Sequence, residues 1–272
     1  MNTKMKTKSA LSYFGSDSEV AGELASLLNH CSHVTIPFVG GASIVPYLKA
    51  RAIVANDLNA NAINFYRVVS GIYGETPRQE LISRCQNTLS HPDELDLAKA
   101  FLLRTDGYHT SRAWAYWTVC WLSRKGKGGC KGDSGLPSVR WSANGGTNAT
   151  RIQAAAHDLE AWASHFKRCE WESRDFREIL SKVKDEPANG IYCDPPWVDA
   201  GDSYLHSFTE QDHYDLRESL NRLKSATVVV RYGDDEFIRS LYRYWHIIEA
   251  SSRDQCNAVK GELWITNKAV SA

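Results

Sequence analysis

The segment Ile191–Trp197 constrains the fold of this chain more than any other stretch, because two prolines directly follow a short run typical of a buried strand. Consecutive prolines fit neither a central strand nor a helix interior, since each lacks a backbone donor and has a fixed φ angle. The residue before a proline is also held away from helical backbone. The chain therefore leaves the strand at Asp194 in a stiff turn, and open α/β sheets bind their ligands at that end of their strands.

The turn formed by Asp194, Pro195, Pro196 and Trp197 collects a specific set of groups in a small volume. A carboxylate oxygen and the carbonyls beside the prolines accept the two hydrogens of an exocyclic amine. A flat indole stacks on the heterocycle that carries such an amine. A simpler interpretation is a strand-ending turn with a capping aspartate, and the tetrapeptide alone leaves both interpretations open.

Length, charge and cysteine content bound the class of protein. A chain of 272 residues is long enough for one large α/β domain or for a domain with an inserted lobe. Basic and acidic residues both number 32, so any surface that binds nucleic acid has to be local. Seven cysteines without a Cys-x-x-Cys pair indicate reduced thiols in a cytoplasmic compartment, and neither a disulfide framework nor a zinc site. No signal-peptide core and no run of 18 apolar residues is present, so we expect a soluble protein without membrane or metal.

The first part of the chain has the order of a nucleotide-binding unit. A strand over 34–39 runs into the turn Gly40-Gly41, which we expect to open a helix through about Lys49, and a second strand, 52–56, ends at Asp57. Glycines let the backbone approach a ligand closely, and an acid at the end of the second strand accepts ribose hydroxyls. The glycine pair taken singly fits an ordinary turn, whereas the ordered combination favours a ligand site.

Hydrophobic periodicity predicts the remaining elements. Helical patterns cover 20–28, 59–103, 151–167, 177–183 and 210–223, and strand patterns cover 169–172, 191–194, 226–232, 245–250 and 262–267. The last two strands are a candidate hairpin. Asp175 precedes one of the helices, and N-cap preference considered alone assigns this side chain to capping.

The composition changes between Arg104 and Arg151. Eight lysines and arginines stand there against two acids, six aromatic residues are interleaved, and crowded glycines predict loops. Basic groups neutralise phosphates, while rings and guanidinium planes stack on exposed bases. The residues expected to contact phosphates or bases are Arg124, Lys125, Lys127, Lys131 and Arg140. A run of charges is often merely solvated, so that reading stays open. Trp114, Trp117 and Trp121 have helical spacing and are expected in the core.

Three elements stand in one order, namely 37–41 with Asp57, then Asp175-Phe176, then the turn at Asp194. In this the chain resembles the Dam-type (class alpha) DNA adenine N6-methyltransferases, which use S-adenosylmethionine, and the resemblance covers most of 11–267. It implies an α/β fold with a Rossmann-like methyltransferase sheet and an inserted, mostly helical and loop-rich target-recognition lobe. We expect a discontinuous catalytic domain over 10–70 and 168–268 and the lobe over 71–167.

The resemblance also implies roles for single residues. Asp194 holds the target amine, Trp197 stacks on the flipped base, and Pro195 and Pro196 complete the catalytic turn. Asp57 binds the ribose hydroxyls, and Asp175 accepts the adenine amine of the cofactor. The implied cofactor-binding set is Tyr13, Gly15, Ser16, Asp17, Pro37, Phe38, Gly40, Gly41, Ser43, Asp57, Asp175, Phe176 and Asp194.

Two positions depart from the pattern of the family, and both belong to the cofactor end. Asp17 stands where a lysine usually closes the first cofactor segment, and Ile36 stands where a glutamate commonly precedes the Pro-Phe pair. These departures leave the expected reaction type in place and predict altered cofactor contacts.

The expected function is methyl transfer from S-adenosylmethionine to the N6 amine of adenine in DNA, with extrusion of the base and direct in-line attack. The expected partner is DNA, duplex or single-stranded, and the oligomeric state is open. Alternatives are a cytosine N4 or RNA adenine methyltransferase, a small-molecule methyltransferase, and an inactive DNA-binding relative. The complete Asp-Pro-Pro-Trp turn argues against the inactive relative, because binding alone does not require that acid.

Overall fold

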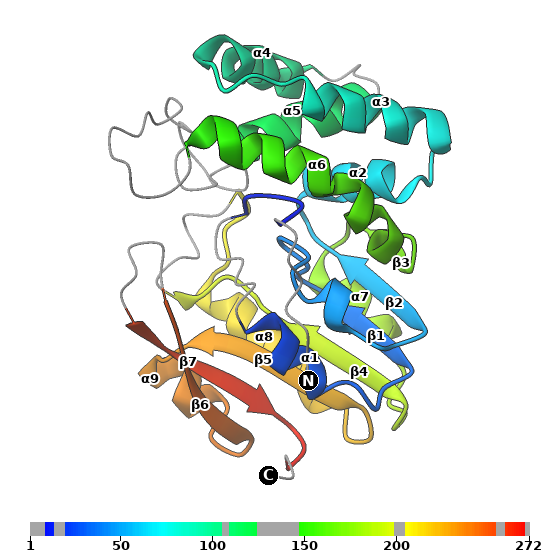
Figure 1. Cartoon of the computed structure of the whole chain (residues 1–272). Helices are drawn as coiled ribbons and strands as arrows, with labels where there is room; N and C mark the ends of the chain where they lie inside the picture. Colours follow the sequence, from blue (N-terminus) through cyan, green and yellow to red (C-terminus); the bar gives the residue numbers. More distant parts are fainter. Residues whose placement is uncertain are drawn as a thin grey trace.

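The structure is a computed structural model that describes residues 9–13, 20–104, 109–123, 147–198, 205–253 and 259–269. Within these residues the centre of the fold is one sheet in the order β3-β2-β1-β4-β5-β7-β6 (Figure 1). The strands are β1 (His33–Ile36), β2 (Ala52–Asn56), β3 (Cys169–Glu172), β4 (Asn189–Cys193), β5 (Thr227–Gly233), β6 (His246–Arg253) and β7 (Val259–Thr266). Strands β1 to β5 are parallel, whereas β7 is antiparallel to both of its neighbours, β5 and β6.

This strand order brings the loops after β1, β2 and β4 to one edge of the sheet. Strand β1 pairs in parallel with β2 on one side and with β4 on the other, so the chain order reverses between β1 and β4. Open sheets bind ligands outside the carboxyl ends of their strands at such a switch point. The parallel part of the sheet has the Rossmann-like arrangement expected from the sequence, and the antiparallel pair β6–β7 confirms the predicted hairpin.

Three helices near the site begin at polar caps. They are α7 (Phe176–Lys182), α8 (Glu210–Asn221) and α9 (Glu236–Leu241). The side chains of Asp175, Thr209 and Asp235 accept backbone N–H groups of their first turns, and Asp212 completes a capping box with Thr209. Helix α9 has no counterpart in the sequence prediction, because six residues are too few for a clear helical period.

The helix expected from the glycine turn through Lys49 does not form, and that prediction is wrong. After α1 (Ala21–Ser26) and β1, the chain makes only one 3₁₀ turn, η1 (Val45–Tyr47). In a helix that runs from the glycine turn through Lys49, Pro46 would stand in the interior, where its missing N–H breaks the hydrogen bonding; in the first turn of η1 that N–H is not needed. Leu48 is already extended and buries its side chain in the core, which stabilises the early exit from the turn.

Among the described residues between β2 and β3, the chain forms five helices. They are α2 (Ala60–Ser70), α3 (Glu75–Gln86), α4 (Pro92–Leu103), α5 (His109–Leu122) and α6 (Asn148–Phe166). The helical pattern over 59–103 is therefore broken into three helices rather than continuous. Gly71, with φ of 79°, ends α2, and Gly74, with φ of 103°, precedes α3. Helices α3 to α6 form a layer beyond the carboxyl edge of the sheet (Figure 1).

Helix α5 is the core of this helical layer. It packs against α2, α3 and α4 and buries every residue from Ala113 to Leu122. Trp114, Trp117 and Trp121 are all buried, which confirms that their helical spacing marks the core. The Nε1 of Trp114 donates to the hydroxyl of Thr88 (2.8 Å), so its polar atom is satisfied inside the layer.

The hydrophobic core is continuous between the sheet and the helical layer. The ring of Tyr66 on α2 stacks on Trp171 of β3 (4.7 Å between centroids) and meets Phe166 at the end of α6 edge-on (5.0 Å). One cluster of buried side chains includes these rings together with residues of β1, β2 and α5. The division of the chain into 10–70 with 168–268 and 71–167 remains a prediction.

Candidate active site

The loop after β1 is held against the end of β2 by one carboxylate. The backbone N–H of Gly40 donates to Oδ2 of Asp57 (2.9 Å), and the N–H of Asn59 donates to Oδ1 (2.9 Å). The hydroxyl of Tyr66 donates to the carbonyl of Gly40. Burial raises the pKa of Asp57, and the two backbone N–H groups and the charge of His206 oppose that rise. Each oxygen of Asp57 has a second lone pair for a further donor.

The backbone of this loop requires a small residue at position 40. Gly40 has a φ of 48°, a conformation that residues with a side chain rarely adopt. A Cβ at this position would lie 3.5 Å from Cε1 of Tyr13, so the tyrosine ring packs directly against the glycine. The structure thus brings Tyr13, Gly40 and Asp57 together. Other loop residues expected at the cofactor are buried or partly buried, namely Pro37, Phe38, Gly41 and Ser43.

A buried amide, Asn56, ties two of the loops together. Its Nδ2 donates to the carbonyls of Pro37 and Arg174 (both 2.9 Å), and its Oδ1 accepts from the N–H of Arg174 (2.9 Å). The loop after β1 and the loop after β3 are therefore fixed by one side chain from the last position of β2. Sequence reasoning did not assign a role to Asn56, although a polar amide ending an apolar strand is a usable signal.

Asp175 acts as the cap that N-cap preference predicts. Its Oδ1 accepts from the N–H of Arg177 (2.8 Å), and the guanidinium of Arg177 pairs with Oδ2 (3.2 Å). The same guanidinium pairs with Asp212 and Asp215 on α8. It also lies 4.3 Å from the ring centroid of Phe176. Arg177 thus fixes Asp175 in place, and it is a residue that sequence reasoning missed.

Three phenylalanines form an apolar wall beside Asp175. Phe38 follows β1, Phe176 begins α7 and Phe208 precedes α8. Their ring centroids are 5.3 Å apart for Phe38–Phe176 and 5.7 Å apart for each of the other two pairs. Segments distant in sequence therefore supply flat apolar surface next to a carboxylate, a combination suited to a heterocycle with an amine.

Asp194 follows β4 and belongs to a buried chain of charges. Nη1 of Arg231, on the neighbouring strand β5, donates to Oδ2 of Asp194 (3.0 Å). Nε and Nη2 of the same arginine donate to the two oxygens of Glu262 on β7 (3.0 and 2.5 Å). The side chains are 24% exposed for Asp194, 4% for Arg231 and 0% for Glu262. Burial raises the pKa of Asp194, while the charge and hydrogen bond of Arg231 lower it.

The indole of Trp197 lies over the end of β5. A Cβ at Gly233 would meet Cε3 of Trp197 at 2.6 Å, so only a glycine lets the ring reach this backbone. The guanidinium of Arg231 lies 5.3 Å from the ring centroid, and a hydrogen bond from Trp197 lowers the pKa of Asp194. Pro195 is buried and Pro196 is partly buried. The turn that the sequence singled out is thus fixed through contacts with the next strand.

Several expected site residues lie outside the described residues. They are Gly15, Ser16 and Asp17 of the first cofactor segment, and the basic residues Arg124, Lys125, Lys127, Lys131 and Arg140. Sequence reasoning also assigned no role to Arg231, Glu262 and Gly233. A charged residue within the apolar run of β5 was the available signal for Arg231, because charged side chains are almost never fully buried unless paired.

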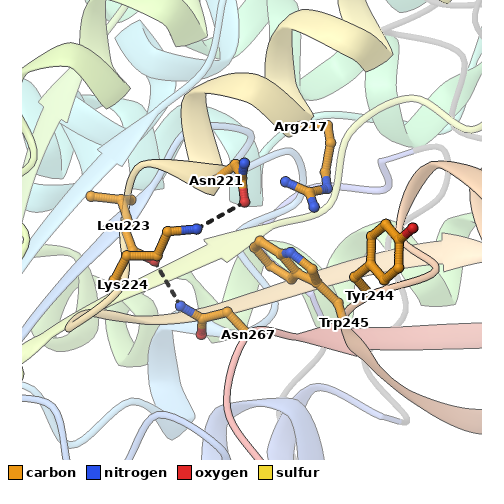
Figure 2. A pocket seen from close by; sticks show the side chains of 7 residues that line it. All are labelled: Arg217, Asn221, Leu223, Lys224, Tyr244, Trp245 and Asn267. Carbon is orange, nitrogen blue, oxygen red and sulfur yellow. Dashed lines mark hydrogen bonds between the residues drawn. The ribbon is translucent and has the colours of Figure 1, made fainter.

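A separate cavity of about 330 Å³ lies at the opposite edge of the sheet, where β5 begins and β7 ends (Figure 2). Its lining residues are Arg217, Asn221, Leu223, Lys224, Tyr244, Trp245 and Asn267. Lys224 donates to Oδ1 of Asn221 (3.0 Å), and Asn267 donates to the carbonyl of Leu223 (2.9 Å). None of the expected site residues lines this cavity.

Within the described ranges, no group of three or more His, Cys, Asp and Glu side chains is arranged to hold a metal ion. The helices of that part of the chain include none that is long and apolar enough to cross a membrane. The five cysteines that the structure describes are buried and form no disulfide with one another.

Comparison with known proteins gives matches over most of the chain. The model of a family described as D12 class N6 adenine-specific DNA methyltransferase matches residues 13–119 and 140–255. Two relatives called DNA adenine methylase, from two strains of Vibrio cholerae serotype O1 (Ogawa 395 and El Tor Inaba N16961), are each 22% identical over 257 residues. The match covers 88% of this chain and 86% of each relative. A crystal structure titled SMU.472, a putative methyltransferase complexed with SAH, is 10% identical to this chain, with a TM-score of 0.29. The match covers 68% of this chain and 55% of that chain.

Proposed function

Because the chain belongs to the D12 class N6 adenine-specific DNA methyltransferase family, we propose that it transfers a methyl group from S-adenosylmethionine to the exocyclic N6 amine of adenine in DNA. The observation that carries the proposal is the acceptor Asp194, held by Arg231 at the carboxyl end of β4. Strand β4 is the direct neighbour of β1, whose loop contains Gly40. Adjacent strands thereby supply an acceptor for a target amine and a cradle for a nucleoside-like cofactor.

The residues after β1, β2 and β3 fit S-adenosylmethionine. Ribose hydroxyls need acceptors, and the carboxylate of Asp57 has lone pairs beyond those used by its two backbone partners. An adenine ring with its amine needs an aromatic wall and an acceptor, which Phe38, Phe176 and Asp175 supply. When bound, S-adenosylmethionine supplies a methyl group on a positively charged sulfur, which is electrophilic.

Asp194 acts on the target amine as a hydrogen-bond acceptor. The adenine amine is a weak nucleophile because its lone pair is delocalised into the ring. Asp194 accepts one amine hydrogen and the carbonyl of Pro195 accepts the other, which draws the nitrogen toward tetrahedral geometry and localises the lone pair. Fixed acceptors strengthen as positive charge develops on the nitrogen, and alignment of the reacting atoms lowers the barrier further.

Trp197 receives the target base. A paired adenine keeps the reacting face of its amine within the stack, so the nucleotide has to be extruded or already single-stranded. The indole follows the acceptor directly in sequence and is fixed by its contact with Gly233. Stacking of a base on such a ring contributes roughly 1–3 kcal/mol.

DNA is the substrate that the family indicates, and the basic residues between Arg124 and Arg140 are proposed to contact it. Contacts from lysine and arginine to phosphates release counterions, so binding should weaken steeply as salt rises. A small-molecule methyltransferase would not show this salt dependence on DNA.

The test is methyl transfer to DNA of mixed sequence, with labelled S-adenosylmethionine, followed by digestion to nucleosides and mass analysis. The expected product is N6-methyladenine. N4-methylcytosine as the product, or label in RNA alone, would replace the proposed substrate. Asp194→Ala should lower turnover by about 10²- to 10³-fold or more, because it removes an acceptor that is strongest in the transition state.

A matched variant separates loss of chemistry from loss of cofactor binding. Asp57→Ala should weaken binding of S-adenosylhomocysteine, the non-reactive product, whereas Asp194→Ala should leave that binding largely unchanged. Binding of S-adenosylhomocysteine to each folded variant is measured by calorimetry. Normal turnover of Asp194→Ala would overturn the proposed role of this carboxylate.

A further inference from the structure

We propose that Arg231 and Glu262 are positioning residues that keep Asp194 aimed and charged as the acceptor of the target amine. The inference deepens the proposed function and rests on it. Neither residue touches the reacting atoms, and both act through the carboxylate of Asp194.

The geometry makes Arg231 a bridge between two carboxylates. It uses Nε and Nη2 on Glu262 and Nη1 on Oδ2 of Asp194. Such a planar fork fixes the direction of each partner, because the donors of a guanidinium have set angles. A carboxylate has about four lone-pair sites, so Asp194 keeps acceptor capacity for the amine of the substrate beyond its bonds from Arg231 and Trp197.

Glu262 in turn fixes the arginine. Its side chain is fully buried on β7, two strands away from β4 in the sheet, and pairs with Arg231 at two points. Trp197 lies over the same guanidinium and is held by the backbone of Gly233. Acceptor, arginine and base-stacking ring are therefore one rigid unit, anchored from β7.

The charge of Arg231 in this unit favours the ionised form of Asp194, against the burial that raises its pKa. Burial favours the neutral acid, whereas an adjacent cation favours the carboxylate. The three groups carry a net charge of about −1, so loss of Arg231 would leave two close carboxylates that compete for a proton. A protonated Asp194 is a poorer acceptor for an amine hydrogen.

The other titratable groups that face Asp194 among the described residues do not carry this charge. They are Tyr192 and Cys193 on β4 and Tyr232 on β5. Burial raises the pKa of all three, so each is neutral over the working pH range. We therefore expect the acid limb of kcat, measured at saturating cofactor, to follow the protonation of Asp194 as set by Arg231 and Glu262.

The decisive experiment is the pH profile of kcat for Arg231→Met, Arg231→Lys and Glu262→Gln. Without the cation, Asp194 takes up a proton more readily. As the pH is lowered, Arg231→Met should therefore lose activity at a higher pH than the natural protein does. Lysine restores a positive charge without the fork, so Arg231→Lys should recover the position of the acid limb but only part of kcat.

Glu262→Gln should move the acid limb in the opposite direction. The charge of Arg231 is then no longer shared with a second carboxylate and stabilises the anionic Asp194 more strongly. A shift of about one pH unit in each direction corresponds to a tenfold change in the protonation equilibrium. A general loss of structure would not move the acid limb in opposite directions in Arg231→Met and Glu262→Gln.

Arg78→Met is the matched control. Arg78 is also a buried arginine between two glutamates, Glu75 and Glu160, but it lies in the helical layer. Its replacement should leave the acid limb in place. Binding of S-adenosylhomocysteine, measured by calorimetry, reports whether each variant is folded. If Arg231→Met does not bind it, Arg231→Lys and Glu262→Gln decide the question.

The inference would be overturned if Arg231→Met and Glu262→Gln shifted the acid limb in the same direction. It would also be overturned if Arg231→Lys and Glu262→Gln both lowered kcat and left the acid limb unchanged, which would indicate a purely structural role. Failure of the proposed function is distinguishable from this result. In that case the natural protein itself transfers no methyl group to adenine in DNA.

Discussion

Two arginines organise carboxylates at the edge of this sheet, and they do so in different surroundings. Arg177 pairs with Asp175, Asp212 and Asp215 while its side chain is 38% exposed. Arg231 pairs with Asp194 and Glu262 while its side chain is 4% exposed. The cluster of Arg177 lies at the proposed cofactor side, and the cluster of Arg231 lies at the proposed base side.

Exposure to solvent determines how strongly each arginine affects the stability and the charge of its carboxylate partners. Exposed ion pairs are screened, and their median contribution to stability is about 0–1 kcal/mol. A buried charge that loses its partner costs far more, because it remains without solvent. The Arg231 cluster should therefore control both stability and the charge of Asp194, whereas the Arg177 cluster should mainly orient Asp175.

The largest effect is expected for Arg231→Met. This variant takes the cation of Arg231 away from the buried carboxylate of Glu262, so the free energy of unfolding should fall by about 3–5 kcal/mol in urea titrations. Adding Glu262→Met should recover most of the loss, since an apolar pair removes the uncompensated charge. A double variant that is as unstable as the single one would show that packing rather than charge causes the loss.

The next effect is expected for Asn56→Ala. It removes three hydrogen bonds and leaves the buried carbonyl of Pro37 without this donor, which costs about 1–3 kcal/mol, while the backbone groups of the exposed Arg174 lose less. These groups belong to the loops around the proposed cofactor site. The affinity for S-adenosylhomocysteine should therefore decrease by a larger factor than kcat measured at saturating cofactor. Equal losses in both would contradict a role confined to the cofactor loops.

The sequence predicted the parts of this site that depend on neighbours in the chain. Two prolines are enough to end a strand, so the position of Asp194 at the carboxyl end of β4 follows from local backbone limits. The glycine turn and Asp57 follow from the same reasoning. The capping role of Asp175 needed only N-cap preference.

The parts that the sequence did not reveal depend on strand pairing across long separations. Arg231 and Glu262 are 31 residues apart and meet only because β7 inserts between β5 and β6. Gly233 matters because the ring of Trp197, from another loop, rests on it. The helix expected through Lys49 failed for a related reason, since burial of Leu48 is a tertiary effect.

Gly233→Ala tests the contact between Trp197 and the end of β5, beside the Arg231 cluster. A Cβ would approach Cε3 of Trp197 to 2.6 Å, so the indole has to move away from the Arg231 cluster. Overpacking of this kind costs about 1–3 kcal/mol, and turnover on duplex DNA should fall more than binding of S-adenosylhomocysteine. Trp197→Phe in the same background should relieve the clash, because the smaller ring lacks the outer edge of the indole. If Trp197→Phe did not recover stability in the Gly233→Ala background, the loss would not come from the clash with the indole.

The smallest effect is expected for Arg177→Met. Its ion pairs are partly exposed, so the loss in stability at pH 7 should not exceed about 1 kcal/mol and should shrink at high salt. The pKa of Asp215 is lowered by hydrogen bonds from Gln211 and Arg177; partial burial raises the pKa of Asp212, but hydrogen bonds from Arg177 and Thr209 lower it overall. Stability from lowered carboxylate pKa values is present above the pKa of an unfolded aspartate, about 3.9, and disappears as the pH falls through the lowered folded values. The natural protein and the variant should therefore converge in urea titrations as the pH is lowered below about 4. If Arg177→Met instead destabilised the protein as much as Arg231→Met at pH 7, exposure would not be what separates the two clusters.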